Sequence, residues 1–591
     1  MSPHASFVPQ SITPRHRSLP RSRGAARALT LLALLGAAAC GDDGEGPDVA
    51  STDTDASGTS TGAAVDETST GTLETGGTST TASTEASSGS GTSEDTSTGE
   101  PTQTLLERVA TAMGGEAELL AIETLRVESS GESWITEEAY EPEGAFPTTT
   151  FVEIAAFDLP QAALRIDLDR SVGTFGVPTP QTFREIVVGE HGWIDGSESL
   201  FGFPAGEMQS DRVAAEVRQQ RLLHPLLLVR DALGDPSIAS EAGSDGVVAQ
   251  LVIEDPVHPI TLWIDEATAL PLRATTLEND HVWRDVAVEV TFEGWAATKA
   301  GVSFPQDVVL SVRGITSRSE TRTSIEVGPE LPADAFELPG APVLPFSAAD
   351  AERGAKNHHF HQSWANAGLP RDGLDLAIVP VAVPGHDAVT LLTGPASYNT
   401  LVIERDAGVV VVEAPLYAPR CEAILDWIDA EIGKPVEAVV ITHHHYDHSA
   451  CARTFVGAGA TLVAGQAAEG FWDQVLAAES TVEPDRLAQS GVTPDLAVVA
   501  SSYALGGDPL GVEVFEVTSE HAADITMVLA DGVLFTSDLY NPGFPQLLPY
   551  GPGDLLGAVQ SNGLEADVQA IVGGHGGEVH TLAQLEAAAG M

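Results

Sequence analysis

The stretch ITHHHYDHSA, residues 441–450, places four histidines and one aspartate within six consecutive positions. Burying so many imidazole and carboxylate groups together is costly unless a partner compensates them. On a loop after a strand, His443 and His445 would point to one side, and Asp447 and His448 could reach a neighbouring point. One metal ion could not accept all four in a reasonable geometry, whereas two ions about 3.5–4 Å apart could. The pattern therefore predicts a two-metal hydrolytic site.

The spacing His-x-His-x-Asp-His, preceded by Thr442 and the hydrophobic run VEAVVI, resembles the signature of the metallo-β-lactamase fold superfamily. Three later segments resemble its remaining ligand blocks in the expected order: VEVFEVTSEHAAD (512–524), GVLFTSDLYNP (532–542) and AIVGGHGGEV (570–579). A lone histidine-rich stretch could be a chance surface cluster, but four blocks that each follow a strand count against that. The resemblance covers about residues 375–591. It implies these metal ligands: His443, His445 and His521 for one ion, Asp447, His448 and His575 for the other, and Asp538 between them.

The resemblance also implies two Zn²⁺ ions, with iron possible because His and Asp ligands suit both metals. A water shared by the two metals would be activated for attack on a carbonyl, with Asp447 as the catalytic residue that orients it or takes its proton. Glu413 stands where relatives usually have Asp, and we expect it to hydrogen-bond a ligand histidine. His444 is expected either to face solvent or to support a ligand. Tyr446 and Tyr540 are expected to serve in packing rather than in substrate contact.

Charge narrows the substrate. The chain has 85 acidic and 28 basic residues, for a net charge of −57, and this field disfavours nucleic acids as partners. After Lys434 the fixed cations are Arg453 and Arg486, whereas binding a phosphate or carboxylate normally takes arginine or lysine. The sequence therefore predicts a hydrolase of an uncharged small acyl compound: an ester, lactone or amide. The alternatives are an iron-dependent redox enzyme of the same fold, and a ligand-binding envelope lipoprotein with a vestigial metal site.

The N-terminus predicts export. An arginine-rich stretch leads into ALTLLALLGAAA (28–39), which has the length of a signal-peptide core and is too short to span a bilayer. Residues 1–39 resemble a bacterial lipoprotein signal peptide, in which Cys40 becomes the lipidated first residue. Gly41 favours an outer-membrane anchor, periplasmic or at the cell surface, which would be the protein's contact with the membrane. Cleavage near Ala39 and secretion is the alternative.

The rest of the chain divides by composition. Residues 40–103 hold the lipidated Cys40 and a Ser/Thr/Gly/acidic stretch that cannot form a core, so we expect a disordered linker. In residues 104–345 we expect an opening helix and then a β-rich domain. The pattern resembles the half-barrel domains that carry lipids or lipoproteins in the periplasm. Structural filler or a platform that presents substrate are equally open roles for it.

Residues 346–372 are expected to be an interdomain linker, with His358, His359 and His361 as a surface cluster. In residues 373–591 strands alternate with helices, which predicts an αββα sandwich of the metallo-β-lactamase type. Cys421 and Cys451 would lie near each other at the starts of two helices. An exported chain permits a disulfide, but we expect two separate buried thiols.

Overall fold

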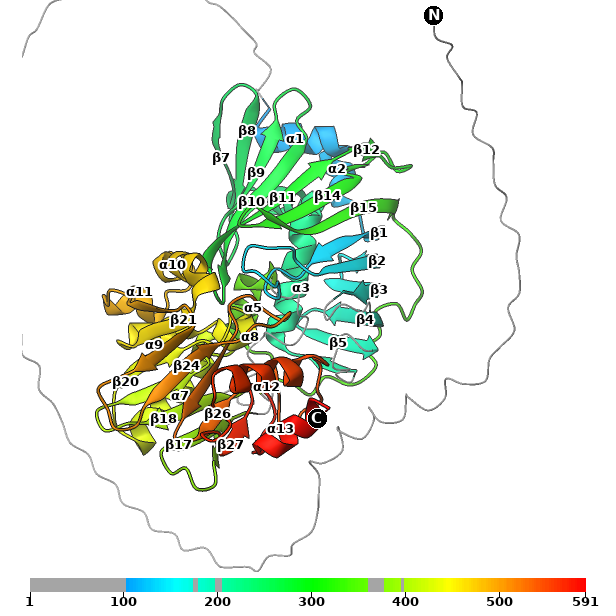
Figure 1. The fold of residues 1–591 in the computed structure, drawn as a ribbon. Coiled ribbons are helices and arrows are strands. Elements are labelled where there is room, and N and C mark those ends of the chain that lie inside the picture. Colours follow the sequence, from blue (N-terminus) through cyan, green and yellow to red (C-terminus); the bar gives the residue numbers. More distant parts are fainter. Residues whose placement is uncertain (1–102, 174–178, 197–204, 360–376, 395–397, 591) are drawn as a thin grey trace, which may run out of the picture. The chain divides into compact units, whose positions relative to one another are not determined.

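A long antiparallel sheet forms the first half of the chain in the computed structural model, which describes residues 103–173, 179–196, 205–359, 377–394 and 398–590 (Figure 1). Two helices, α1 (Leu105–Met113) and α2 (Glu116–Leu120), come first. Thirteen strands then pair in the order β6-β5-β4-β3-β2-β1-β15-β14-β11-β10-β9-β8-β7. Their bounds are β1 (Thr124–Trp134), β2 (Thr148–Asp158), β3 (Ala163–Val172), β4 (Thr179–Val188), β5 (His191–Gly196), β6 (Gly206–Met208), β7 (Ala239–Ser244), β8 (Val248–Ile253), β9 (Ile260–Asp265), β10 (Pro271–Asp280), β11 (Arg284–Glu293), β14 (Asp307–Val312) and β15 (Ile315–Val327). A two-stranded pair, β12 (Ala296–Ala297) and β13 (Ser303–Phe304), accompanies them.

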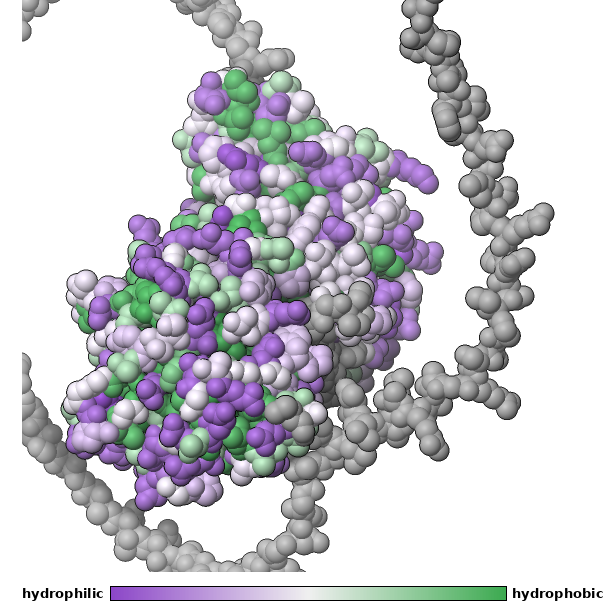
Figure 2. Space-filling model, viewed as in Figure 1, coloured by the Kyte–Doolittle hydropathy of each residue, from purple (hydrophilic) through white to green (hydrophobic). Residues whose placement is uncertain are grey.

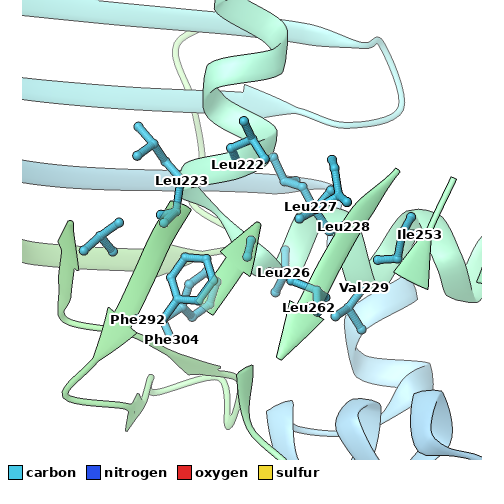
Figure 3. Packing of buried hydrophobic residues seen from close by; sticks show 14 of the residues in the cluster. Leu222, Leu223, Leu226, Leu227, Leu228, Val229, Ile253, Leu262, Phe292 and Phe304 are labelled. Atoms are coloured by element: carbon cyan, nitrogen blue, oxygen red, sulfur yellow. The ribbon is translucent and has the colours of Figure 1, made fainter. Parts of the chain in front are cut away.

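Two helices, α3 (Ser210–Leu223) and α4 (Pro225–Gly234), connect the opposite edges of this sheet and supply much of its core. Figure 3 shows leucines of both helices beside Leu262 of β9, Phe292 of β11 and Phe304 of β13, all of them buried. The strands bury every second side chain, as the alternation in the sequence predicts. The prediction of an opening helix and a β-rich region is confirmed. The half-barrel resemblance stays a prediction.

Helix α5 (Ala348–Lys356) lies inside the predicted linker and is followed by two buried histidines. His358 Nδ1 lies 2.5 Å from Glu278 Oε1, and His359 Nε2 lies 3.0 Å from Asp280 Oδ2. Burial alone would lower the pKa of His359, but the hydrogen bonds to Asp280 and Glu278 raise it to about 10. The expectation of a surface cluster is wrong for these two residues, because their carboxylate partners on β10 are far away in the sequence. His361 lies outside the described residues.

The second half of the chain contains two sheets with helices on their outer faces. The seven-stranded sheet runs β16 (Val379–Ala382), β17 (Val389–Thr393), β18 (Thr400–Glu404), β19 (Val409–Val412), β20 (Val436–Val440), β21 (Thr461–Gly465) and β22 (Leu496–Val499). The five-stranded sheet runs β23 (Ser502–Leu505), β24 (Val512–Glu516), β25 (Thr526–Ala530), β26 (Val533–Phe535) and β27 (Ala570–Val572). The helices are α7 (Ala418–Glu431), α8 (Tyr446–Ser449), α9 (Ala452–Gly457), α10 (Glu469–Ala477), α11 (Arg486–Ser490), α12 (Gly551–Ser561) and α13 (Leu582–Ala588).

Three apolar clusters define four layers in this half. Val412 of β19 and Val440 of β20 pack with Phe535 of β26 in the cluster between the two sheets. A second cluster joins the outer face of the first sheet to α7, α9 and α10, and a third joins the outer face of the other sheet to α12 and α13. The predicted αββα layering is therefore present.

The turn between β10 and β11 reaches from the β-rich region into the second of these clusters. Val282 is 5% exposed and packs within it, and the Trp283 ring meets the edge of Phe471 with a centroid distance of 4.8 Å. Asp285 extends the contact, since its backbone N–H donates to Glu479 O at 3.0 Å and its Oδ2 accepts from Thr481 Oγ1 at 2.5 Å. The two regions thus share buried apolar contacts and belong to one compact unit.

Cys421 of α7 and Cys451, just before α9, form a disulfide with a Cα–Cα distance of 6.0 Å. The expectation of two separate thiols is wrong. Both residues follow neighbouring parallel strands, and this topology brings the two helix starts together at one edge of the sheet.

The surface mixes residue types. Figure 2 shows hydrophilic and hydrophobic residues interspersed over the face it presents, and single exposed apolar side chains are normal on protein surfaces. Among the described helices, none has the length and apolar character needed to cross a membrane. The predicted signal peptide (1–39), Cys40 and nearly all of the predicted linker (40–103) lie outside the described residues.

Candidate metal centre

The histidine-rich loop begins where the buried strand β20 ends. Backbone hydrogen bonds hold its start, with Ile441 N donating to Val463 O at 2.9 Å and Thr526 N donating to Thr442 O at 2.8 Å. The loop then enters the short helix α8, whose first residues are Tyr446 and Asp447. The side chains at 443, 445, 447 and 448 therefore gather at the carboxyl end of the sheet, where α/β proteins bind their ligands.

Three buried histidines form a first group. His443 Nε2 lies 3.0 Å from His445 Nδ1 and 3.1 Å from His521 Nε2. Two nitrogens can share one proton, but three nitrogens that face one point cannot all satisfy one another. Burial, and then the neighbouring imidazoles, lower the pKa of both His443 and His445 well below the usual range. Neutral nitrogens that converge in this way could hold a metal ion.

Asp447, His448, His575 and Asp538 form a second group that could hold a metal ion. His448 Nε2 lies 3.4 Å from Asp447 Oδ2 and 3.2 Å from Asp538 Oδ1. His575 Nε2 lies 2.8 Å from Asp538 Oδ1 and 3.7 Å from Asp447 Oδ2. These residues come from α8 and from the loops after β26 and β27, so the second sheet supplies half of the group.

Asp538 lies between the two groups. Its Oδ2 is 3.2 Å from His521 Nε2 and 4.0 Å from His443 Nε2, while its Oδ1 contacts the second group. Burial alone would raise the pKa of this carboxyl, but His448 and His575 hold it well below its usual range. The structure thus brings together all seven residues that the resemblance names, with Asp538 in the intermediate position expected of it.

A buried atom without a partner supports the fit of a metal to this site. Asp447 Oδ1 is buried and has no hydrogen-bond partner among the described residues, whereas His448 Nε2 and Asp538 Oδ1 contact other members of the second group. Burial opposes a charge on His448, yet Asp447 and Asp538 raise its pKa well above the usual range. Its Nε2 therefore lies at a position where a positive charge is favoured, and such a position suits a metal ion.

Polar side chains behind His443 and His448 determine which nitrogen of each ring faces the metal groups. His443 Nδ1 lies 3.2 Å from both Ser537 Oγ and Thr442 Oγ1, and Thr442 Oγ1 donates to Glu413 Oε1 at 2.5 Å. Glu413 Oε1 also lies 3.4 Å from His448 Nδ1, within ion-pair distance of this candidate ligand, and its supporting role stays a prediction. Ser537 was not predicted, although its position directly before Asp538 at a buried strand end could have identified it. These contacts leave His443 Nε2 and His448 Nε2 free to face the metal groups.

Two of these supporting residues have unusual backbones. Glu413 has φ 76° and Ser537 has φ 51°, in the left-handed region that non-glycine residues rarely adopt. Such conformations cost on the order of 1–3 kcal/mol and cluster at functional sites. The local strain thus coincides with the two side chains that orient ligand histidines.

His444 points away from the two metal groups. Its Nδ1 lies 2.7 Å from Asp524 Oδ1, and both side chains are buried. Of the two expectations for this residue, the solvent-facing one is wrong. The pair anchors the middle of the loop to the segment that carries His521, so His444 supports the arrangement of both.

The loop between β1 and β2 also reaches the first group. Ala139 O is 2.9 Å from His445 Nε2 and can only accept a hydrogen bond, so the proton lies on Nε2 and Nδ1 faces His443. Glu138 Oε2 is 3.4 Å from His445 Nδ1. Burial, with the charges of Asp447 and Asp538, raises the pKa of Glu138 well above its usual range. No sequence motif indicated either residue, because they are about 300 positions away from the loop they contact.

Aromatic side chains flank His575. Tyr398 meets its ring edge-on with a centroid distance of 5.1 Å, and Phe544 stacks on it at 5.4 Å. Tyr446 is 1% exposed, which agrees with the expected packing role. The hydroxyl of Tyr540 shares a hydrogen bond with His580 Nδ1 at 2.7 Å. Neither Tyr398 nor Phe544 was predicted, because no ligand motif contains them.

The two late arginines are already paired. Arg453 binds Asp485 at 2.6 Å, and Arg486 pairs with the carboxylate of Glu422. The Arg453 pair is buried, whereas the Arg486 pair is exposed. The part of the chain after Lys434 therefore offers no unpaired arginine among its described residues.

One comparison with known proteins, the match to a family model, agrees with the residue pattern. Residues 393–555 match the family model described as metallo-beta-lactamase superfamily. Similar solved structures include a metallo-beta-lactamase from Pontibacter korlensis, at 17% identity and a TM-score of 0.30, covering 36% of this chain and 98% of that one. Another is FIM-1 from Pseudomonas aeruginosa in its mono-zinc form, at 19% identity and a TM-score of 0.29, covering 37% of this chain and 96% of that one. The comparison with curated proteins gave no match. Residues 393–555 are therefore a metallo-β-lactamase superfamily domain, and the chain carries a His/Asp cluster that could bind metal ions.

Proposed function

We propose that this chain is a zinc-dependent hydrolase that cleaves an uncharged ester, lactone or amide. The observation that carries the proposal is the pair of ligand groups joined by Asp538, with all seven ligand atoms converging from four separate loops. Two Zn²⁺ ions held there would lower the pKa of a shared water and polarise the carbonyl of a substrate.

The chain's own residues have separable roles in this reaction. Asp447 orients the attacking water and takes its proton at Oδ1, the carboxylate oxygen that lacks a hydrogen-bond partner. Glu413, Ser537 and the carbonyl of Ala139 fix the imidazoles so that the correct nitrogen of each faces the site. Tyr398 and Phe544 shield His575 from water.

The pairing of both arginines with carboxylates favours an uncharged substrate. A phosphate or carboxylate would find Arg453 and Arg486 already bound to carboxylates, and it would approach a chain of net charge −57. We therefore propose a neutral acyl substrate. The test compares kcat/KM for 4-nitrophenyl acetate and for a phosphodiester at low and at high salt, and a higher rate on the phosphodiester at low salt would contradict the proposal.

The metal assignment is tested by metal analysis of the full chain. We expect close to two zinc ions per chain, and His445→Ala should lose at least one ion and most of the esterase activity. His191→Ala, a histidine on β5 in the sheet of the β-rich region, is the matched control and should keep both. Full metal and full turnover in His445→Ala would show that the assignment is wrong, and iron in place of zinc would favour the redox alternative.

We propose further that the protein acts in the bacterial cell envelope, exported and anchored in the outer membrane through a lipidated Cys40. The Cys421–Cys451 disulfide supports export, because such bonds persist in oxidising compartments. Cys40→Ser should release the protein from the membrane fraction without changing its esterase activity. Secretion without an anchor would instead place the unmodified chain in the medium.

A further inference from the structure

A small cavity lies in the β-rich region, between helix α3 and the part of the sheet formed by β15, β1, β2, β3 and β4. Its polar lining includes Glu153 of β2, Glu185 of β4, Arg212 and Glu216 of α3, and Arg318 of β15. The cavity has a volume of about 50 Å³. Since one water molecule needs roughly 10–15 Å³ of such space, a group of a few heavy atoms fits there.

Charged side chains surround this cavity, whereas the neighbouring part of the same core is apolar. Figure 3 shows the leucines of α4 among apolar side chains of the strands beside them. At the cavity, Arg318 instead pairs with Glu153 at 3.0 Å and with Glu320 at 2.6 Å, and Arg212 pairs with Glu185. None of these five side chains is more than 6% exposed. A lining of buried charges does not suit an acyl chain, so the cavity favours a polar ligand.

Two carboxyl groups of the lining can still bind a partner. Glu185 is 3% exposed, and its Oε2 is buried without a hydrogen-bond partner among the described residues. Glu216 is 7% exposed, its Oε1 accepts from Gln220 Nε2 at 3.3 Å, and no ion pair joins it to a described residue. Burial, and then the nearby charge of Glu185, raise the pKa of Glu216 to about 8, with Glu153 adding to the rise and Arg212 opposing it. The inner end of the cavity therefore lacks a positive charge beside Glu216.

The outer end of the cavity carries a further arginine. Arg170 of β3 is half-buried, and its Nε donates to Gln181 Oε1 at 2.8 Å. Gln181 is also its register partner on β4, whereas the partner of Glu185 is Ile166, four positions away along β3. This separation corresponds to roughly 13 Å along the strand. A ligand in the cavity thus meets a positive charge at the outer end and carboxyl groups at the inner end, which favours a cationic group at the inner end.

We propose that this cavity binds a small organic cation whose primary ammonium group lies between Glu185 and Glu216. An ammonium group has three donors and no acceptor, so it satisfies Glu185 Oε2 and gives Glu216 the opposite charge that the described residues do not supply. The proton of Glu216 leaves to solvent when the ligand binds. A short apolar chain on the ammonium contacts Ile166 and Leu168, which line the same cavity. The site shares no residue with the metal centre and does not depend on the proposed hydrolase function.

Isothermal titration calorimetry of the full chain with ethylammonium chloride tests this proposal. We expect one ligand per chain, bound about tenfold more tightly at pH 9 than at pH 7, because the ionised fraction of Glu216 rises by about that factor across a pKa of about 8. Ethylammonium stays charged over this range, as a lysine side chain does. Glu216→Gln should weaken binding by about tenfold or more at pH 9 and remove the pH dependence. Glu132→Gln, at an exposed acid on the opposite face of β1, is the matched control and should behave as the parent chain.

Ethanol and acetate, titrated in the same way, distinguish the ligand classes, and both should bind about tenfold or more weakly than ethylammonium. Leu168→Phe fills part of the cavity without removing a charge, so it serves as a second variant if Glu216→Gln does not fold, and it should also weaken binding. Absence of ethylammonium binding to the parent chain, or equal affinity in the parent and in Glu216→Gln, would overturn the proposal. Equal binding of ethanol would show that charge has no role, and displacement of ethylammonium by an equal concentration of potassium chloride would indicate an inorganic cation; either result would overturn the ammonium site.

Discussion

Breaking the disulfide between Cys421 and Cys451 should destabilise the metal-binding region by several kcal/mol. The two cysteines are separated by 30 residues, and the segment they enclose contains β20 and four of the residues in the two metal groups. For a loop of this size, the loss of chain entropy in the unfolded state corresponds to about 3.6 kcal/mol at 25 °C. Both cysteines also pack in the apolar cluster under α7 and α9. A larger or polar residue in their place would therefore lower the stability further, which is why alanine is used.

The measurement is urea unfolding of the full chain, followed by tryptophan fluorescence. Cys40→Ser is present in every sample, so that the chain stays soluble and Cys421 and Cys451 are the two cysteines left in the parent. The double variant Cys421→Ala, Cys451→Ala is compared with the oxidised parent, and reduced parent protein serves as the control for loss of the bond without mutation. With an m-value of about 3 kcal/mol/M, the midpoint should fall by roughly 1 M urea.

The free energies of unfolding of the reduced parent and the double variant should agree within about 1 kcal/mol, since both proteins lose the same constraint. The oxidised parent should unfold at a higher urea concentration than either. If all three samples unfold at the same urea concentration, the bond does not constrain the unfolded chain and the entropic reasoning is refuted.

Three further predictions concern other parts of the molecule. Glu413→Gln should keep the fold but weaken zinc binding by about 10–100-fold in a chelator competition, because it loosens the orientation of His448. The control is Glu516→Gln, at an exposed position. Equal zinc affinity of the two variants would contradict the role of Glu413. His359→Gln should cost about 3–5 kcal/mol of stability at pH 7 by leaving Asp280 without its buried cation, while Glu278 keeps its ion pair with Arg218. The pKa of His359 is about 10 in the folded chain, against an ordinary value of 6.5. The stabilisation is therefore full below pH 6.5 and is lost as the pH rises towards 10. The free energies of unfolding of parent and variant should become equal at high pH. Limited proteolysis should cut first within 41–103, without loss of activity, and next between 340 and 372; a first cut elsewhere would contradict the predicted linker.

The seven residues of the two candidate ligand groups could be located in the sequence because each lies in a short motif directly after a hydrophobic strand. His443, His445, Asp447 and His448 share six positions, and the segments around His521, Asp538 and His575 keep a fixed order along the chain. Parallel strands bring their carboxyl ends to one edge of a sheet, so local motifs in the right order are enough to place these residues together.

The rest of the site depends on contacts between distant residues. The burial of His358 and His359 depends on Glu278 and Asp280, about 80 positions earlier. Glu138 and Ala139 reach His445 across about 300 positions, and the pairing of Cys421 with Cys451 depends on how two helices start beside each other. Such contacts follow from the packing of the two regions, for which a single sequence contains no periodic or spacing signal.

The turn between β10 and β11 sets the smallest unit that can be cut out of this protein. A fragment that begins at residue 373 would lose Val282 and Trp283 from the cluster under α10, and would leave Phe471 partly uncovered. It would also leave Thr481 and Glu479 without their partner Asp285 and remove the carbonyl that fixes the His445 tautomer. The candidate metal-binding region therefore cannot be moved to another protein as a fragment cut at the motif boundary, and a fragment for fusion or engineering has to begin before β1.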